Sequence, residues 1–316
     1  MCVIKNDIYD TIIIGSGPAG LTAAIYNIRS DLKTIVISGG QPGGQLTITT
    51  LVENFPGFEK GIGGLKLMMD MMNQFRNLGG QIMSQEVVEV RKSQNGFEVK
   101  LKNGDKLEGK AVIVATGSRA KWLGIKGEEE FIGRGVSGCA TCDGMFFRDK
   151  IVMVVGGGDV ACTEVSFLAK FASKVYMVHR RDELRASLVE QKKVLNNPKI
   201  EILWNTEALE VLGGDKVEKV KLVNNKTNKE KEMKIDGFFV AIGHDPATGF
   251  VGGLVALKES GQIIVRGGNE YHTMSSVEGI FAAGDCVDDR YRQAVVAAGM
   301  GAMAGLDAEK WIETKY

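Results

Sequence analysis

Short runs of apolar residues, each closed by glycine, recur along this chain. The two most alike are TIIIGSGPAG at residues 11–20 and IVMVVGGGDVA at residues 151–161. In both, an apolar run of strand length leads into a glycine-rich turn and then into residues that suit the start of a helix. The pattern predicts a buried parallel strand, a tight turn and a helix at each place.

The small residues in the two turns have the spacing of the dinucleotide-binding fingerprint. They are Gly15, Gly17 and Gly20 in the first turn, and Gly156, Gly158 and Ala161 in the second. The first position permits the turn, the second lets a pyrophosphate approach the backbone, and the third lets helix and strand pack closely. A phosphate then meets free N–H groups at the helix N-terminus. One such turn is weak evidence, but the repeat favours two dinucleotide sites.

Further apolar runs indicate how the chain is divided. AVIVATG ends at Gly117 and GFFVAIGH ends at His244, so each fingerprint is followed by a related closing strand. Residues 279–289, GIFAAGDCVDD, predict one more strand and a turn, and residues 291–312 predict a long helix rich in alanine and glycine. This last stretch is too short for a domain. We therefore expect it to return to the first unit.

The expected fold class is α/β, with two Rossmann-like dinucleotide-binding domains, the second inserted into the first. The first domain is expected to be discontinuous and to comprise residues 1–117 and 246–316. The inserted domain is expected to comprise residues 118–245.

The inserted domain carries a basic segment where its second strand should end. SKVYMVHRRDELRA places there His179, Arg180, Arg181 and Arg185. An NAD site is expected to have a carboxylate at this position, for the ribose 2′-hydroxyl. A carboxylate would repel a 2′-phosphate, whereas arginine binds it through charge-assisted hydrogen bonds. A solvated basic face is the alternative, but the position relative to the second fingerprint favours an NADPH site.

The first domain lacks the acidic residue of an NAD site. At the equivalent strand end, TIVISGGQPGGQLT offers Ser38 and a glycine-rich loop, which suits binding of another cofactor through the backbone. Near the C-terminus, Gly284 and Asp285 form another turn after a strand, followed by Arg292 at the start of a helix. Asp285 suits a ribityl or ribose hydroxyl, and a helix N-cap role could coexist with that contact.

Two of the five cysteines lie three residues apart in SGCATCDGMF, as Cys139 and Cys142, with Asp143 beside them. A zinc site needs four ligands, and no second Cys or His pair has ligand spacing. A structural disulfide is unusual in a cytosolic protein. A dithiol that cycles between thiol and disulfide is therefore favoured. Asp143 begins a DG turn, a dipeptide that is a strong turn signal.

Composition narrows the class of protein. The 316 residues carry 39 basic and 39 acidic side chains, so the balanced charge gives no argument for nucleic acid or an anionic membrane as a partner. No apolar run approaches the roughly 18 residues of a membrane span, and the N-terminus does not resemble a secretory signal. An odd number of cysteines without framework spacing fits a reducing compartment. We expect a cytoplasmic protein.

Taken together, the motifs resemble those of one family over essentially the whole chain. In order they are GSGPAG, GGQL, VENFPG, ATG, CATCDG, GGGDVA, HRRDELRA, AIGHDPAT and AAGDCVDDRYRQA. The chain is similar to the low-molecular-weight thioredoxin reductases. The resemblance implies FAD in the first domain, NADPH and a redox-active disulfide in the inserted domain, thioredoxin as protein substrate, and a homodimer.

The resemblance also implies site residues. Those expected at the FAD site are Gly15, Ser16, Gly17, Pro18, Ala19, Gly20, Ser38, Gly39, Gly40, Gly43, Gly44, Gln45, Leu46, Thr50, Asn54, Val87, Ala115, Thr116, Gly117, Gly284, Asp285, Arg292, Gln293 and Ala294. Those expected at the NADPH site are Gly156, Gly157, Gly158, Asp159, Val160, Ala161, His179, Arg180, Arg181, Arg185, Ile242 and Gly243. The disulfide is expected between Cys139 and Cys142, with Asp143 as the acid, and no metal is expected.

The implied reaction passes a hydride from NADPH to FAD, then electrons to the disulfide, and then to thioredoxin by dithiol–disulfide exchange. Three alternatives stay open: a reductase that serves a peroxidase through another redox domain, a ferredoxin-linked relative, and a nucleotide-sensing module without turnover. The ferredoxin-linked type should lack the arginine cluster. Cys286 stands where the family more often has an aliphatic residue, and Cys286 and Cys162 are both expected to be small buried residues.

Overall fold

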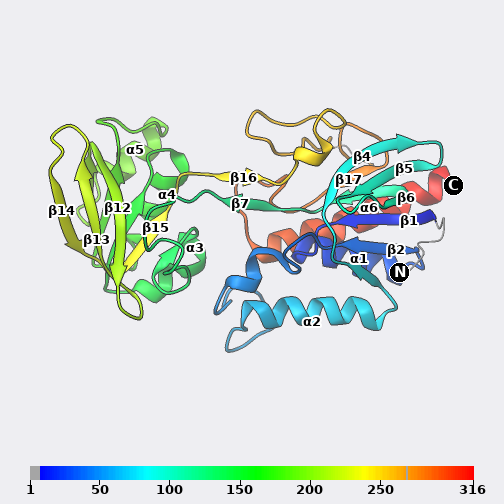
Figure 1. Cartoon of the computed structure of the whole chain (residues 1–316), viewed down its shortest axis with the longest axis horizontal. Helices are drawn as coiled ribbons and strands as arrows, with labels where there is room; N and C mark the ends of the chain where they lie inside the picture. The colour runs from blue at the N-terminus through cyan, green and yellow to red at the C-terminus, as the bar shows by residue number, and fades with distance from the viewer. Residues whose placement is uncertain (1–7, 268–269) are drawn as a thin grey trace. The chain divides into compact units, whose positions relative to one another are not determined.

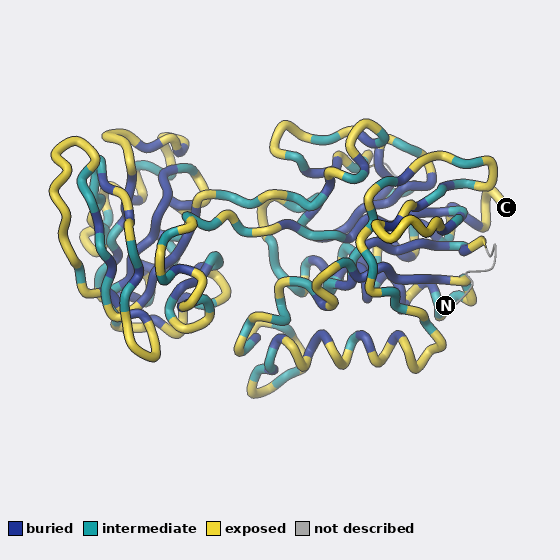
Figure 2. The backbone as a smooth tube through the Cα atoms, in the orientation of Figure 1, coloured by how far each residue is buried: buried dark blue, intermediate teal, exposed yellow. Residues whose placement is uncertain are grey.

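The computed structural model describes residues 8–267 and 270–316, and these divide into two compact units (Figure 1). One unit contains the described residues up to Arg119 together with those from Asp245 onward, and the other runs from Ala120 to His244. The second unit is thus inserted between two stretches of the first. Each unit encloses its own buried strands (Figure 2).

The sheet of the first unit is built on parallel strands. β1 (Ile8–Ile14) pairs with β2 (Thr34–Ile37) and with β6 (Lys106–Val114), while β2 pairs with β3 (Gln81–Met83) and β6 with β17 (Ile280–Ala282). All four residues of β2 are buried, as are most of β1. This burial on both faces explains why these strands read as continuous apolar runs in the sequence.

Shorter elements complete the first unit. Two antiparallel strands extend the sheet beyond β6, namely β5 (Gly96–Leu101) and β4 (Val87–Ser93). The remaining elements are η1 (Gly44–Ile48), α2 (Gly64–Asn77) and η3 (Gly249–Val251).

Close helix packing covers one face of this sheet. α1 (Pro18–Arg29) follows β1, and α6 (Ala294–Lys315) follows β17, and both helices contribute to one apolar cluster with the strands. A Cβ atom on Gly301 of α6 would overlap a backbone carbonyl of α1, and at Gly305 it would lie 3.0 Å from another. Nδ2 of the buried Asn27 donates to the Gly305 carbonyl at 2.8 Å. Glycine in α6 therefore permits the two backbones to meet.

The second unit repeats the parallel arrangement. Its five-stranded sheet has the order β11 (Ile200–Trp204), β10 (Lys174–His179), β9 (Ile151–Val155), β15 (Gly237–Val240) and β8 (Val136–Ser137). All neighbouring strands of this sheet pair in parallel. The helices of this unit are α3 (Ala140–Asp143), η2 (Gly144–Phe147), α4 (Asp159–Leu168) and α5 (Leu188–Leu195).

A three-stranded antiparallel sheet accompanies the parallel one. It consists of β12 (Thr206–Gly213), β13 (Val217–Asn224) and β14 (Glu230–Lys234). Cross-strand ion pairs lie on its surface, Lys219 with Glu232 and Lys221 with Glu230, each at 2.7 Å. The two connections between the units contain β7 (Ser118–Ala120) and β16 (His244–Pro246), which pair with each other.

The predicted fold class is confirmed. Each unit contains a parallel sheet in which a strand, a glycine turn and a helix follow one another, and one unit interrupts the sequence of the other. In the described part of the chain, no helix is both long and apolar enough to cross a membrane.

The contact between α1 and α6 predicts how alanine substitutions in α6 change the free energy of unfolding. Gly301→Ala should lower the free energy of unfolding by about 1–3 kcal/mol, because its Cβ would overlap backbone that cannot rotate away. Gly299→Ala on the same helix is the matched control, since its Cβ would meet nothing within 4 Å. It should raise stability by about 0.5–1 kcal/mol. Urea unfolding of both variants tests this, and equal effects would contradict the close packing.

Candidate active site

A disulfide joins Cys139 and Cys142, with their Cα atoms 5.4 Å apart. Cys139 is the N-cap of α3, and its carbonyl accepts hydrogen bonds from the backbone N–H groups of Cys142 and Asp143. This single helical turn brings the two sulfur atoms together. Cys142 is exposed and Cys139 half-buried, so the disulfide is accessible from outside this unit. The pairing expected from the family resemblance is thus present.

Asp143 lies directly beside the disulfide and is largely enclosed. Burial raises the pKa of its carboxyl group above the ordinary value, and a hydrogen bond with the Ser137 side chain partly opposes that shift. The Ser137 hydroxyl also accepts the backbone N–H of Cys139 at 3.0 Å. A carboxyl group with a raised pKa holds its proton nearer to neutral pH, which suits a group that exchanges protons with thiols.

The first glycine turn has the geometry of a dinucleotide cradle. A Cβ atom on Gly15 would overlap the Ala115 carbonyl oxygen, and one on Gly20 would overlap the Gly15 carbonyl oxygen, so both positions require glycine. At Gly17, in contrast, a Cβ would meet nothing within 4 Å. Gly17 is the N-cap of α1 and provides no side-chain cap. Free N–H groups beside an open space are suited to an anionic group.

A second loop is attached to this turn. The Ser16 hydroxyl accepts the backbone N–H of Gly43 at 2.9 Å, and Gly43 has a φ of +90°, which favours glycine. A Cβ on Gly44 would lie 3.8 Å from the Gly17 Cα atom. Ser38, at the end of β2, is buried, and its N–H bonds the Met83 carbonyl at 2.9 Å. The predicted loop from Ser38 to Gln45 therefore lies against the first fingerprint.

Other residues predicted for this site converge from distant parts of the sequence. The Gln45 side chain donates to the Ser118 carbonyl, and the Asn54 amide donates to Gln293 Oε1 at 3.1 Å. The Thr116 hydroxyl donates to the Ala247 carbonyl at 2.8 Å. These contacts join the segment around η1 to both ends of the discontinuous unit.

The turn after β17 lies against the first fingerprint. A Cβ on Gly284 would lie 3.0 Å from the Ala19 Cβ of α1. Burial and the neighbouring Asp288 raise the pKa of Asp285 to about 6, while Arg292 lowers it. Arg292 has a φ of +48°, and Asp288 accepts its backbone N–H at 2.8 Å. An enclosed carboxyl group at this turn suits a hydroxyl ligand, because such a ligand can donate a hydrogen bond to it.

Four further residues predicted for the FAD site have different surroundings in the first unit. Val87 begins β4 and packs against the apolar core of the sheet, whereas Thr50 is exposed after η1. Leu46 packs against the cluster formed by α1 and α2, and Ala294 is the first residue of α6.

The second glycine turn repeats the cradle in the other unit. A Cβ on Gly156 would lie 2.5 Å from the Ala241 carbonyl and 2.6 Å from the Ala161 Cβ, whereas one on Gly158 would meet nothing within 4 Å. Gly158 is the N-cap of α4 and provides no side-chain cap. Gly157 lies against the His179 ring, which a Cβ would overlap. This turn also leaves open space in front of uncapped N–H groups.

The basic segment lies next to this second turn. The backbone N–H of Arg185 donates to the Gly157 carbonyl at 2.7 Å. Arg180, Arg181 and Arg185 are exposed, and their guanidinium groups form no hydrogen bond or ion pair with residues of the described ranges. His179 differs from them, because it is buried and its pKa is lowered chiefly by that burial. The arginines, rather than His179, are therefore available to an anionic ligand.

Several groups are excluded as parts of the site. Cys162 and Cys286 are fully buried, and burial raises the pKa of each thiol to about 11. No group of three or more His, Cys, Asp or Glu residues among residues 8–267 and 270–316 is placed to hold a metal ion.

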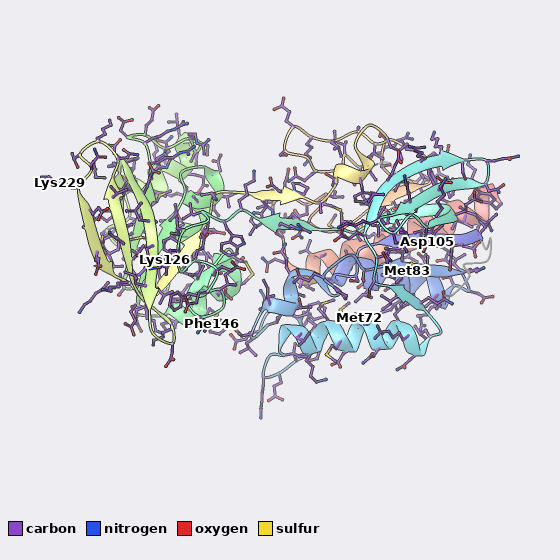
Figure 3. The ribbon with its side chains drawn as sticks, in the orientation of Figure 1. Met72, Met83, Asp105, Lys126, Phe146 and Lys229 are labelled. Carbon is purple, nitrogen blue, oxygen red and sulfur yellow. A yellow bond between two sulfur atoms is a disulfide. The ribbon has the colours of Figure 1, made fainter. Side chains whose placement is uncertain are left out.

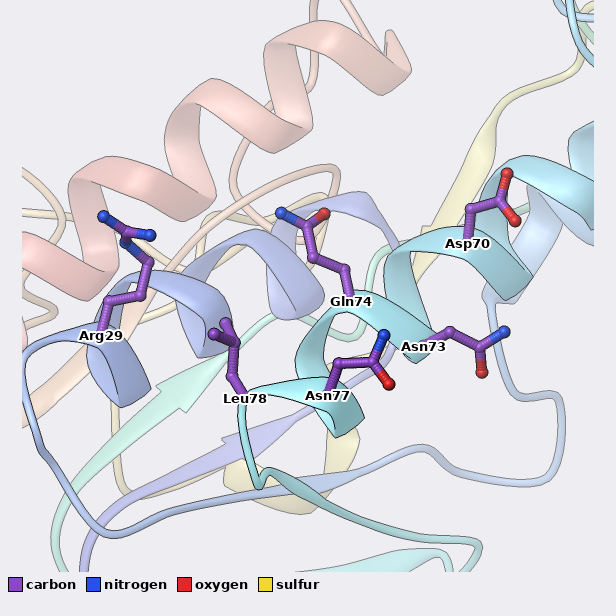
Figure 4. A pocket seen from close by; sticks show the side chains of 6 residues that line it. All are labelled: Arg29, Asp70, Asn73, Gln74, Asn77 and Leu78. Carbon is purple, nitrogen blue, oxygen red and sulfur yellow. The ribbon is translucent and has the colours of Figure 1, made fainter.

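A surface pocket lies between the C-terminal ends of α1 and α2, at the opposite end of α1 from the fingerprint (Figure 4). It is lined by Arg29, Asp70, Asn73, Gln74, Asn77 and Leu78.

Sequence reasoning missed several polar residues that organise the site. Ser137 stands two residues before Cys139 in the quoted motif, yet nothing in the pattern shows that its hydroxyl would meet Asp143. Gln191 of α5 donates to the carbonyls of Leu184 and Ala186 in the basic segment. A polar residue four after the helix N-cap gives no signal of such a role.

Comparisons with known proteins agree with this geometry. A model of the pyridine nucleotide-disulphide oxidoreductase family matches residues 9–301. A thioredoxin reductase of Rickettsia felis is 48% identical over 304 residues, covering 95% of this chain and 97% of that protein. One of Mycolicibacterium smegmatis is 46% identical, covering 98% of each chain. The crystal structure of thioredoxin reductase from Streptococcus pyogenes has a TM-score of 0.92 and 39% identity, covering 98% of this chain and all of that one.

The chain therefore belongs to the pyridine nucleotide-disulphide oxidoreductase family, in its thioredoxin reductase branch. Both the identity and the mutual coverage extend over nearly the full length, and the disulfide expected of that branch is present.

The thiols should differ sharply in reactivity. After reduction of the protein, iodoacetamide at pH 8 should modify Cys139 and Cys142 and leave Cys162 and Cys286 unmodified, because only the thiolate reacts and the latter pair is buried. Peptide mass spectrometry localises the modification, and a denatured sample provides the control in which all five cysteines of the chain react. Modification of Cys286 in the folded protein would contradict its exclusion from the site.

Proposed function

We propose that this protein is an NADPH-dependent flavoprotein that reduces the disulfide of thioredoxin. The observation that carries the proposal is the accessible disulfide beside a buried carboxyl group, in the same unit as a dinucleotide turn flanked by unpaired arginines. Cofactor, reductant and disulfide chemistry are thereby combined in one chain.

FAD is assigned to the first unit, comprising residues 1–117 and 246–316. The open position at Gly17 would accept the pyrophosphate against the N-terminus of α1, and Asp285 would hold a hydroxyl of the ribityl chain. When bound, a flavin accepts a hydride from a nicotinamide and passes electrons to a disulfide. The role of the surrounding loops is to fix the ring and exclude water.

NADPH is assigned to the inserted unit, residues 118–245. The open position at Gly158 would accept its pyrophosphate, and the exposed Arg180 and Arg181 would bind the 2′-phosphate. The arginine cluster speaks against a ferredoxin-linked enzyme, although one solved relative at 34% identity is titled a ferredoxin-flavin thioredoxin reductase.

The reduced Cys139 and Cys142 then act by dithiol–disulfide exchange. One thiolate attacks a sulfur atom of the partner's disulfide, so that a mixed disulfide forms and the partner's other sulfur leaves as a thiolate. The second cysteine thiolate attacks the mixed disulfide, which restores the Cys139–Cys142 bond and releases the partner as a dithiol. Asp143 supplies or accepts the protons that these thiols exchange, and burial beside the disulfide raises the pKa of its carboxyl group.

The surroundings of the disulfide favour a protein as the substrate. Met145 and Phe146, three and four residues after Cys142, are exposed to 58% and 41%, and Phe146 can be located in Figure 3. Exposed apolar side chains beside a reactive group mark a surface for transient contact with another protein. A nucleotide-sensing module without turnover would have no use for this accessible disulfide.

The disulfide and the nicotinamide belong to one unit and must reach the same flavin, so they are expected to take turns. Gly117 and Gly243 lie in the two connections and have φ values of +68° and +112°. Glycine can absorb the backbone rotation that such an exchange requires.

Compartment and assembly follow from the same proposal. A disulfide that is reduced in every cycle, together with two free buried thiols, suits a reducing cytoplasm. A homodimer is expected from the family resemblance, and sedimentation of the purified protein tests it.

The direct test replaces the cysteines. Cys139→Ser with Cys142→Ser should abolish NADPH-dependent reduction of thioredoxin but leave bleaching of the flavin by NADPH intact, because the disulfide lies downstream in electron flow. Cys162→Ser is the matched control and should keep full activity. The measurement follows NADPH oxidation with thioredoxin present and flavin absorbance without it. Continued thioredoxin reduction by the double variant would refute the proposed route.

The arginines provide a separate test of the reductant. Arg180→Ala with Arg181→Ala should raise the KM for NADPH far more than that for NADH, since each lost charge-assisted contact to the 2′-phosphate costs on the order of 1.5–3 kcal/mol. Arg134→Ala is the control, because that arginine stands at the amino end of β8 and bonds the Glu130 carbonyl. Equal changes in both KM values would mean that the arginines do not bind the phosphate.

A further inference from the structure

The segment between β10 and α5 carries the exposed arginines but forms no helix or strand. Its end next to α5 is nevertheless fixed to the glycine turn by two hydrogen bonds. The Arg185 N–H donates to the Gly157 carbonyl at 2.7 Å, and the Ser187 N–H donates to Asp159 Oδ1 at 2.8 Å. Asp159 is the first residue of α4, immediately after the turn. Its carboxylate therefore joins the turn to the end of the basic segment.

Two more side chains hold the segment from other directions. The buried His179 ring packs on Gly157, and its Nε2 lies 3.0 Å from the Glu183 carbonyl. The Gln191 amide donates to the Ala186 carbonyl at 2.8 Å. Backbone groups within an irregular segment are thus satisfied by side chains, which is what keeps such a segment in one conformation.

The carboxylate of Asp159 is unexpected where it stands. A negative charge at the start of a helix is favourable in the empty protein but repels a pyrophosphate that must bind at the same terminus. The hydrogen bond from Ser187 lowers its pKa, so Asp159 is ionised at neutral pH. Contact with the cofactor therefore does not explain this residue, whereas its bond to Ser187 does.

We infer that Asp159 is a positioning residue that sets the preference for a 2′-phosphorylated dinucleotide, by holding the Ser187 N–H and thereby fixing the arginine segment against the glycine turn. This inference rests on the proposed NADPH site. If the segment were released, the arginines would have to be ordered when the phosphate binds, and part of their binding energy would be lost to that ordering. The adenosine and nicotinamide portions, which NAD shares, would lose much less.

The test measures binding rather than turnover. Calorimetric titration of the oxidised holoenzyme with NADP⁺ and with NAD⁺ gives the ratio of their dissociation constants. Asp159→Ala should lower the preference for NADP⁺ by about five- to tenfold, which corresponds to the net contribution of one ordinary hydrogen bond. Asp159→Asn should hold the preference within about twofold, because its amide oxygen can accept the same N–H.

Ser187, which donates the hydrogen bond to Asp159, provides an independent pair of variants. Ser187 has a φ of −58°, which proline can adopt, so Ser187→Pro removes the N–H donor, together with the hydroxyl that also hydrogen-bonds Asp159. It should lower the preference as Asp159→Ala does, while Ser187→Ala, which keeps the N–H, should have a smaller effect. These variants keep the test decisive if Asp159→Ala fails to fold.

The possible failures are distinguishable. An unchanged preference in Asp159→Ala and Ser187→Pro, alongside a lowered preference in the Arg180→Ala, Arg181→Ala variant, would overturn the inference and leave the NADPH site standing. Equal losses in Asp159→Ala and Asp159→Asn would show that charge matters rather than the hydrogen bond, which also overturns it. An unchanged preference in the arginine variant would refute the proposed NADPH site itself.

Discussion

Everything in this chain depends on two places where a strand, a turn and a helix meet so closely that no side chain fits between them. At Gly15 and Gly20 a Cβ atom would overlap a carbonyl oxygen, and Gly156 is packed between Ala241 and Ala161 in the same way. This approach brings uncapped N–H groups of α1 and α4 to the carboxyl ends of parallel strands. An open space then remains at Gly17 in the first turn and at Gly158 in the second, and both cofactor sites are assigned to such spaces.

These two turns are also what could be predicted most completely from the sequence. The positions that need glycine for steric reasons are visible in the spacing, and strands buried on both faces are visible as apolar runs. The family resemblance added the disulfide pairing of Cys139 with Cys142, which the structure contains. The location of the basic segment beside the second turn followed from the order of elements, because adjacent parallel strands end at the same edge.

The rest could not be predicted, because it consists of contacts between side chains and backbone groups of irregular segments. The resemblance predicts Asp159 at the NADPH site, but the sequence does not show that its carboxylate accepts the Ser187 N–H, 28 residues further on. His179 was grouped with the arginines, but it is buried against Gly157. Nothing in the sequence indicates that the Ser137 hydroxyl would contact Asp143. Such partners are fixed by how loops fold back onto a turn, and spacing along the chain does not record that.

The central claim is that electrons pass from NADPH through a flavin to the Cys139–Cys142 disulfide. An anaerobic titration of the purified holoenzyme with NADPH, followed by flavin absorbance and thiol content, measures this most directly. Since flavin and disulfide each take two electrons, the wild-type protein should consume about two molar equivalents per flavin and gain two thiols, whereas the variant with both cysteines replaced by serine should consume about one. Consumption of about one equivalent by the wild-type protein, with its disulfide intact, would contradict the account.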